Sequence, residues 1–191
     1  VASRGKTILR GINVSVNKGE ILGLVGEGRR AMLLVIAGLW RPIEGSVQFR
    51  GIDTYSRRDE VKKTFGMFLQ GTEPNEELSA RENLIFMANL DGVRDGEKAV
   101  DDLMARCDLT QYANVRISDM SLCDKRKLMI AQGLINKPLL LLLEDPFNGL
   151  KEPELHDIVR LLMKLNKEGI TVICAGRSVD ELGLCDRIVT V

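Results

Sequence analysis

The chain has 191 residues, of which 45% are hydrophobic and 28% are charged, and its 27 basic and 27 acidic side chains cancel to a net charge of zero. This composition is typical of one globular domain and excludes a disordered or fibrous chain. Zero net charge argues against a protein that holds nucleic acid by its phosphates. The apolar runs, such as that over 138–143, are too short to cross a bilayer.

The cysteines and the first residues bear on the cellular compartment. Four cysteines stand at irregular spacings and form no CxxC pair. In a chain of this size, that pattern favours reduced, mostly buried thiols of a cytosolic protein. The sequence opens without a methionine or a signal-peptide pattern, and we therefore expect a trimmed segment of a cytoplasmic protein.

The first half of the chain predicts strands around a glycine-rich corner. Apolar and polar residues alternate over 12–16, which is the period of a half-buried strand. The continuous apolar run 21–25 predicts a strand buried on both faces, and the corner 26–28 follows it. A core helix is expected over 32–39, and two further strands are expected over 46–49 and 65–69.

The middle of the chain predicts helices. Ser79 and Glu82 have the spacing of a capping box, which predicts a helix from there to about Leu90. Two more helices are expected over 97–107 and 124–135. Beyond them, strands are expected over 139–143, 170–174 and 188–191, and one long helix is expected from 151 onward. Short apolar strands that alternate with helices predict an α/β fold with a mainly parallel sheet.

The order of short motifs along the chain carries more information than any one of them. A glycine corner is followed by a strand ending at Gln70, by Arg-Glu-Asn-Leu at 81–84, by Ser121, and by an apolar strand ending in Glu-Asp-Pro at 144–146. This order resembles the nucleotide-binding domain of ATP-binding cassette (ABC) transporters over essentially the whole chain. The element at 81–84 most resembles the ATPase subunits of drug- and sodium-export systems.

The resemblance implies a fold, cofactors and partners. The fold would be P-loop NTPase-like, a single domain over 1–191 with a mainly parallel sheet, antiparallel edge strands and a helical sub-domain inserted at about 71–136. Two such domains would form a homo- or heterodimer that sandwiches ATP and Mg²⁺. A transmembrane transporter subunit would hold the protein at the inner face of the cell membrane. An exposed apolar patch over 84–87 is expected to take part in that docking.

The family's phosphate loop, G-x-x-x-x-G-K-[ST], is altered in this sequence. By resemblance, the nucleotide-binding residues are Gly23, Gly26, Gly28, Arg29, Arg30, Ala31 and Ser121. Arg29 stands at the lysine position and Arg30 at the hydroxyl position, and an arginine has no acceptor atom for Mg²⁺. The loop can be counted from Gly26, which leaves it three residues short, or from Gly23, which takes the end of the strand into it.

The remaining site positions follow from the same resemblance. The family's acidic pair, Asp then Glu, is reversed to Glu144 and Asp145, with Glu144 as the magnesium ligand and Asp145 as the group that orients water. Gln70 keeps its type and serves both metal and catalysis, and Arg177 matches the switch histidine. The aromatic residue that stacks on adenine would fall near Ser3, which offers no stacking surface.

Three functions remain open on the sequence alone. The chain could be an ATP-binding subunit that couples ATP to substrate export with impaired hydrolysis. It could be a catalytically silent pseudo-ATPase that serves as a structural or regulatory partner. The substitutions that suggest this are at Arg29, Arg30, Leu122, Asp124, Asp145 and Arg177. It could also be an altered sequence that keeps only the fold.

Overall fold

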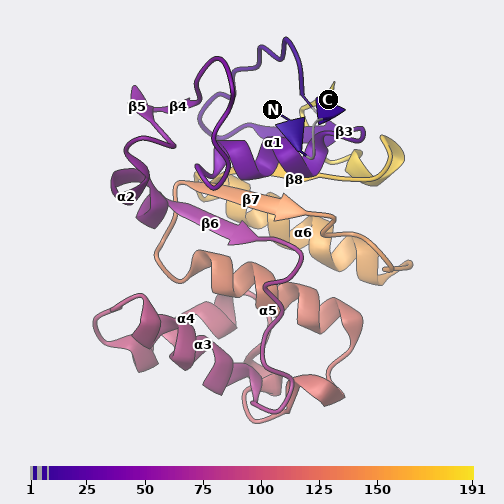
Figure 1. The fold of residues 1–191 in the computed structure, drawn as a ribbon. Coiled ribbons are helices and arrows are strands. Elements are labelled where there is room, and N and C mark those ends of the chain that lie inside the picture. Colours follow the sequence, from indigo (N-terminus) through magenta and orange to yellow (C-terminus); the bar gives the residue numbers. More distant parts are fainter. Residues whose placement is uncertain (1, 4–5, 8) are drawn as a thin grey trace.

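A five-stranded parallel sheet organises the molecule, which we describe from a computed structural model over residues 2–3, 6–7 and 9–191 (Figure 1). Its strand order is β6-β7-β8-β3-β9. In that order the strands span Phe65–Phe68, Leu140–Glu144, Thr171–Ala175, Ile21–Val25 and Arg187–Thr190. All four neighbouring pairs run parallel. The predicted fold class is therefore confirmed, and all five strands lie within one residue of their expected positions.

Two apolar cores lie on opposite faces of this sheet. Side chains alternate along a strand, so Leu141 and Leu143 of β7 join one core and Leu140 and Leu142 join the other. The second core also contains the buried face of α1 (Arg29–Ile36). The first core contains α5 (Leu122–Leu134) and α6 (Glu154–Lys167). Burial on both faces explains why the central strands are continuous apolar runs.

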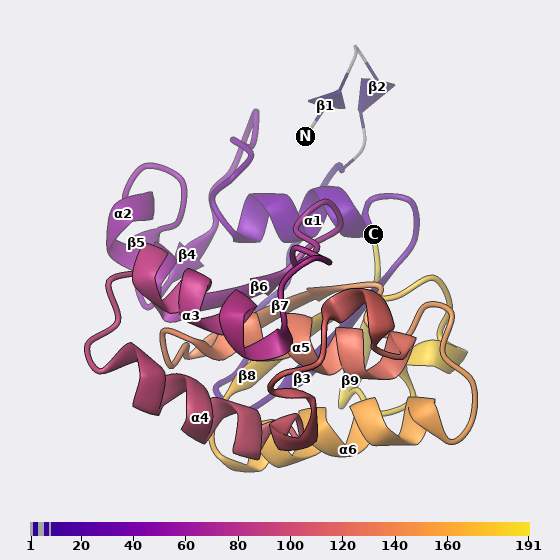
Figure 2. The same ribbon diagram turned by 90° about the horizontal axis from the view of Figure 1, so that it is seen from below.

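The middle of the chain folds into helices below the sheet, as Figures 1 and 2 show. These are α3 (Ala80–Leu90), α4 (Gly96–Arg106) and α5, with short 3₁₀ turns at Thr110–Tyr112 and Ile117–Asp119. Ser79 and Glu82 form the expected capping box, in which Ser79 N–H donates to Glu82 at 2.8 Å. The division of the chain into a core and an inserted sub-domain stays a prediction.

Several local expectations differ from the structure. Residues 12–16 bury their apolar side chains as expected but form no strand, because they share no ladder hydrogen bonds with a neighbour in the described part of the chain. The antiparallel pairs are separate two-stranded sheets, β1–β2 (Ala2–Ser3 and Lys6–Thr7) and β4–β5 (Gln48–Phe49 and Ile52–Asp53). The helix expected over 32–39 begins at Arg29, and α2 (Arg58–Val61) with the 3₁₀ turn Lys62–Thr64 was not expected.

Candidate functional site

The predicted site residues gather at the carboxyl edge of the sheet. In a parallel sheet, the carboxyl ends of all strands meet at one edge, and connecting loops there carry the ligand-binding groups. Strand β3 leads into the corner 26–28 and then α1, β6 ends next to Gln70, β7 ends at Glu144, and β8 is followed by Arg177. Gln70 lies 75 positions before Asp145 in the sequence, yet the two side chains are in contact.

The corner between β3 and α1 consists of residues 26–28. Gly26 has a φ of +105°, and a Cβ atom there would lie 2.1 Å from the carbonyl oxygen of Val191, so only glycine fits. Gly28 N–H donates to that same oxygen at 3.1 Å. Gly23 lies inside β3, opposite Cys174 and Ile188, so the count that began the loop at Gly23 is wrong. The shorter loop that begins at Gly26 describes this corner.

The two arginines of the corner bind the two acids that follow β7. Arg29 lies 3.4 Å from each oxygen of the Asp145 carboxylate, through Nε and Nη2, and its Nη1 donates to Gly26 O at 3.2 Å. Arg30 Nη1 donates to both carboxylate oxygens of Glu144. Glu144 and Asp145 are only 3% and 4% exposed. These carboxylates therefore offset the arginine charge that the α1 dipole would otherwise disfavour.

Gln70 and Arg177 complete this cluster. Gln70 N–H donates to Glu144 at 2.9 Å, and its side-chain amide donates to Asp145 at 3.4 Å. Arg177 Nε lies 3.5 Å from Asp145, and Arg177 N–H donates to Glu181 at 2.9 Å. The fold therefore brings together six of the predicted residues, which we call the arginine–carboxylate cluster: Arg29, Arg30, Gln70, Glu144, Asp145 and Arg177.

Ser121 and Ala31 lie outside this cluster. Ser121 is the N-cap of α5, where its hydroxyl accepts from Asp124 N–H at 3.1 Å and donates to the Asp124 carboxylate at 2.6 Å. A hydrogen bond from Tyr112 to Asp124 raises the pKa of Tyr112 above its usual 10. Ala31 is buried on α1 within the apolar core. The side chain of Ser3 lies outside the described residues.

Two neighbours of the cluster were missed by reasoning from sequence. Arg126 of α5 is half-buried, and its guanidinium carbon lies 5.2 Å from the centroid of the Phe68 ring. Burial lowers its pKa, and its Nε has no partner within the described structure. The other missed neighbour is the carbonyl oxygen of Val191, which accepts a hydrogen bond from Gly28 N–H. Helix α5 packs against both the sheet and other helices, so its apolar residues show no single stripe that could have placed Arg126.

A divalent cation does not fit this cluster. Mg²⁺ needs oxygen ligands in near-octahedral geometry. Both oxygens of Glu144 already accept from Arg30, and those of Asp145 face Arg29, Arg177 and Gln70. Within the described residues, no three His, Cys, Asp or Glu side chains are grouped so that they could hold a metal ion. An anion fits better, because three guanidinium groups against two carboxylates leave one net positive charge at the start of α1.

The comparisons with known proteins establish the family. The "ABC transporter" family matches residues 9–148, and the chain belongs to that family. It is the ATP-binding, nucleotide-binding domain of the ABC type, with the P-loop ATPase fold. Within the described residues, no helix is both long enough and apolar enough to span a membrane.

Curated relatives match almost the whole chain. It is 30% identical over 190 residues to "ABC transporter ATP-binding protein NatA" of Bacillus subtilis, covering 96% of this chain and 77% of the relative. It is 30% identical to "Nod factor export ATP-binding protein I" of Neorhizobium galegae, covering 97% and 55%. It is 31% identical to "Linearmycin resistance ATP-binding protein LnrL" of Bacillus subtilis, covering 96% and 61%. The chain thus spans between about half and three quarters of these relatives.

Solved structures agree with the fold. The dimeric ABC transporter cassette MJ0796 matches with a TM-score of 0.82 at 24% identity, covering 96% of this chain and 86% of that one. A nucleotide-free ATP-binding cassette matches with a TM-score of 0.86 at 21% identity, covering 100% and 83%. MJ0796 has also been solved as a dimer bound to ADP and Pi.

Proposed function

We propose that this chain is the ATP-binding subunit of an export-type ABC transporter in which Mg²⁺-dependent hydrolysis is impaired. The name of the Nod factor export relative supports the export type. One observation carries the impairment: Arg29 and Arg30 bind the two carboxylates on which metal binding and water activation depend. ATP would bind at a dimer interface, with a transmembrane subunit as partner and the inner membrane face as location.

The pairing affects hydrolysis because the two carboxylates have no free oxygen left for their roles. A general base must lie within hydrogen-bond reach of the water that it activates. Asp145 points its oxygens at Arg29, Gln70 and Arg177 instead. It is also one methylene shorter than the family's glutamate, and a displacement of about 1 Å can cost on the order of 100-fold in rate.

The three arginines of the cluster can bind phosphate even where hydrolysis is impaired. Arg29, Arg30 and Arg177 expose 26%, 46% and 52% of their side chains, so each can reach an incoming phosphate while staying near its carboxylate. Attraction between charges at this exposure weakens with salt. We therefore expect nucleotide to bind without Mg²⁺, with little discrimination between bases.

A silent partner subunit is the second candidate function. Its specific support lies at the start of α5, where residues 120–124 stand in place of the family's signature, Leu-Ser-Gly-Gly-Gln. In the family, the glycines of that signature let the helix N-terminus approach the partner's ATP. Here Leu122 is 39% exposed, and the hydroxyl of Ser121 is bonded to Asp124. A chain with both halves of the site altered would act as a structural or regulatory half of a heterodimer.

Calorimetry and turnover together test the proposal. ATP titrated into the chain should bind equally with and without Mg²⁺ and more weakly as salt rises. Arg29→Ser should weaken this binding, whereas Arg58→Ser, an exposed arginine on α2, should not. Turnover should stay below the ordinary enzyme range of about 1–10³ s⁻¹. Turnover within that range that is lost in Asp145→Ala would contradict impaired hydrolysis.

A further inference from the structure

A cavity lies towards the opposite edge of the sheet from the arginine–carboxylate cluster. It has a volume of about 520 Å³, and Leu140 and Thr171, the first residues of β7 and β8, form part of its wall. Glu144 ends β7 four residues later, about 13 Å from Leu140 along that strand, although Met32 of the lining follows Arg29 of the cluster by three residues on α1. Small-molecule sites in proteins have volumes of about 300–1,000 Å³. The cavity is therefore large enough for a ligand of its own.

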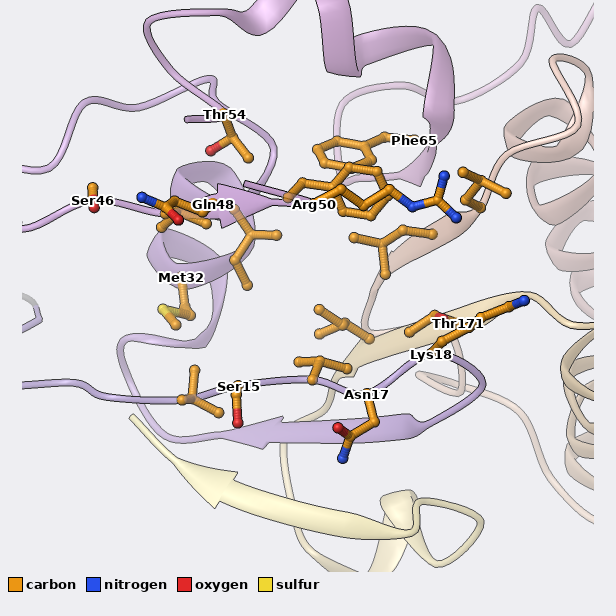
Figure 3. Close-up of a pocket in the computed structure, with 18 of the residues that line it drawn as sticks. Ser15, Asn17, Lys18, Met32, Ser46, Gln48, Arg50, Thr54, Phe65 and Thr171 are labelled. Atoms are coloured by element: carbon orange, nitrogen blue, oxygen red, sulfur yellow. The ribbon is translucent and has the colours of Figure 1, made fainter. Parts of the chain in front are cut away.

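Much of the interior of the cavity is apolar, although Ser46, Gln48 and Thr54 add polar groups to its wall. Val14 and Val16 line it from the segment 12–16, Val47 and Phe49 from the β4 side, and Met32 from α1. Figure 3 shows Ser15 and Asn17 pointing away from the cavity, which agrees with their exposure. The alternation along 12–16 thus presents one apolar edge inward.

The mouth of the cavity is cationic. Its lining contains no aspartate or glutamate and two basic residues, Lys18 and Arg50, whose charged ends lie at the same side of the cavity in Figure 3. Neither forms a salt bridge within the described residues, although Arg50 lies 5.8 Å from the centroid of the Phe49 ring. This contrasts with the arginines of the cluster, each of which has a carboxylate partner.

One wall of the cavity, the segment 12–16, is not joined to a neighbouring strand by ladder hydrogen bonds in the described structure. Within the described structure, the backbone of 12–16 makes no backbone–backbone hydrogen bond, and Arg187 Nη2 donates to Ser15 O at 2.5 Å. A wall that forms no ladder can move outward without breaking sheet hydrogen bonds.

We propose that this cavity binds a single-chain anionic amphiphile of the fatty-acid class. The hydrocarbon chain lies among Val14, Val16, Val47 and Phe49, and the carboxylate lies between Lys18 and Arg50. Burial of the chain supplies the affinity, while the two cations select a negatively charged head over a neutral one. The proposal is independent of the nucleotide site and of the proposed function.

Titration of the purified chain with dodecanoate, below its micelle concentration, tests the proposal. Decanoate should bind more weakly by about fourfold for each methylene removed. Dodecanol, which has the same chain without the charge, should bind at least about fivefold more weakly than dodecanoate. Equal binding of dodecanol and dodecanoate would overturn the assignment of the charged end.

Two pairs of variants locate the site. Val14→Phe places a bulkier side chain where the hydrocarbon chain would lie and should weaken dodecanoate binding, whereas Val179→Phe adds the same bulk at a position that is 56% exposed and outside the lining and should not. Lys18→Gln with Arg50→Gln should weaken dodecanoate about fivefold and leave dodecanol unchanged, whereas Lys63→Gln should change neither. A thermal melt of each variant reports whether it folds. Undiminished dodecanoate binding by a folded Val14→Phe variant would overturn the proposal.

Discussion

In the helical region, the polar side chains that begin helices bond to nearby backbone, whereas at the carboxyl edge of the sheet the charged side chains bond to one another. Ser79 caps α3 and Ser121 caps α5 through residues three positions away. Arg30 instead donates a hydrogen bond to the carboxylate of Glu144, which lies 114 positions later in the sequence. The first kind of contact stabilises a helix end and is formed by residues that are close in sequence. The second kind depends on the fold, which brings opposite charges together where the family binds a ligand.

The largest effect is expected from the apolar packing that supports the helical region. Leu84 on α3 is fully buried, whereas Phe86, two residues further on, is 56% exposed. Leu84→Ala should lower the free energy of unfolding by about 2–5 kcal/mol, because it leaves a cavity in the core. Phe86→Ala should change it by less than about 0.5 kcal/mol, although it removes the larger side chain.

Urea unfolding of both variants measures this difference. The exposure of Phe86, together with that of Leu90 at 66%, agrees with the expected apolar patch, but Leu84 belongs to the core and not to the patch. A cost for Phe86→Ala equal to that of Leu84→Ala would place Phe86 inside a packed interface.

A smaller effect is expected at the carboxyl edge. A double-mutant cycle on Arg30→Gln and Glu144→Gln should give a coupling free energy of about 1 kcal/mol, since one partner is nearly buried and the other is 46% exposed and partly screened by water. The control is the pair Arg57 and Glu60, which are both about half exposed and should couple more weakly because water screens both charges. A coupling no larger than that of the control would mean that the cluster does not hold its charges together.

The smallest effect is a pH dependence at the α3 cap. Hydrogen bonds from the backbone and then the side chain of Ser79 lower the pKa of Glu82 below 4.5. A lowered pKa in the folded state means that this carboxylate contributes stability above pH 4.5, and that the contribution disappears as the pH falls through the folded-state pKa.

Stability measured from pH 6 down to pH 3 tests that cap. The advantage of the parent chain over Glu82→Gln should shrink across this range. Glu77→Gln, which changes an exposed carboxylate with no hydrogen bond of its own in the described part of the chain, serves as the control and should show a flat difference. If the stability difference between the parent chain and Glu82→Gln also did not change with pH, the Glu82 carboxylate would not contribute to the α3 cap.

Much of the fold was predictable because its signals are local. The period of two, the continuous apolar runs and the Ser79–Glu82 spacing act within a few residues, and they placed β3, β7, β8 and α3. The failure at 12–16 shows the limit of such signals. The alternating pattern correctly predicts which side chains turn inward, but a strand also needs a neighbour with free hydrogen-bonding groups, and the pattern carries no information about that neighbour.

The sequence by itself determined the α/β class, the family and the residue types available at the site, since these follow from local periodicity and motif order. Only the tertiary structure decided how the charges are used. The parallel sheet brings the ends of β3, β6, β7 and β8 to one edge, so Arg29 and Arg30 meet Asp145 and Glu144. At the other edge, Lys18 and Arg50 find no carboxylate within the described residues. Charge pairing depends on distance in space, which strand order sets and local sequence does not.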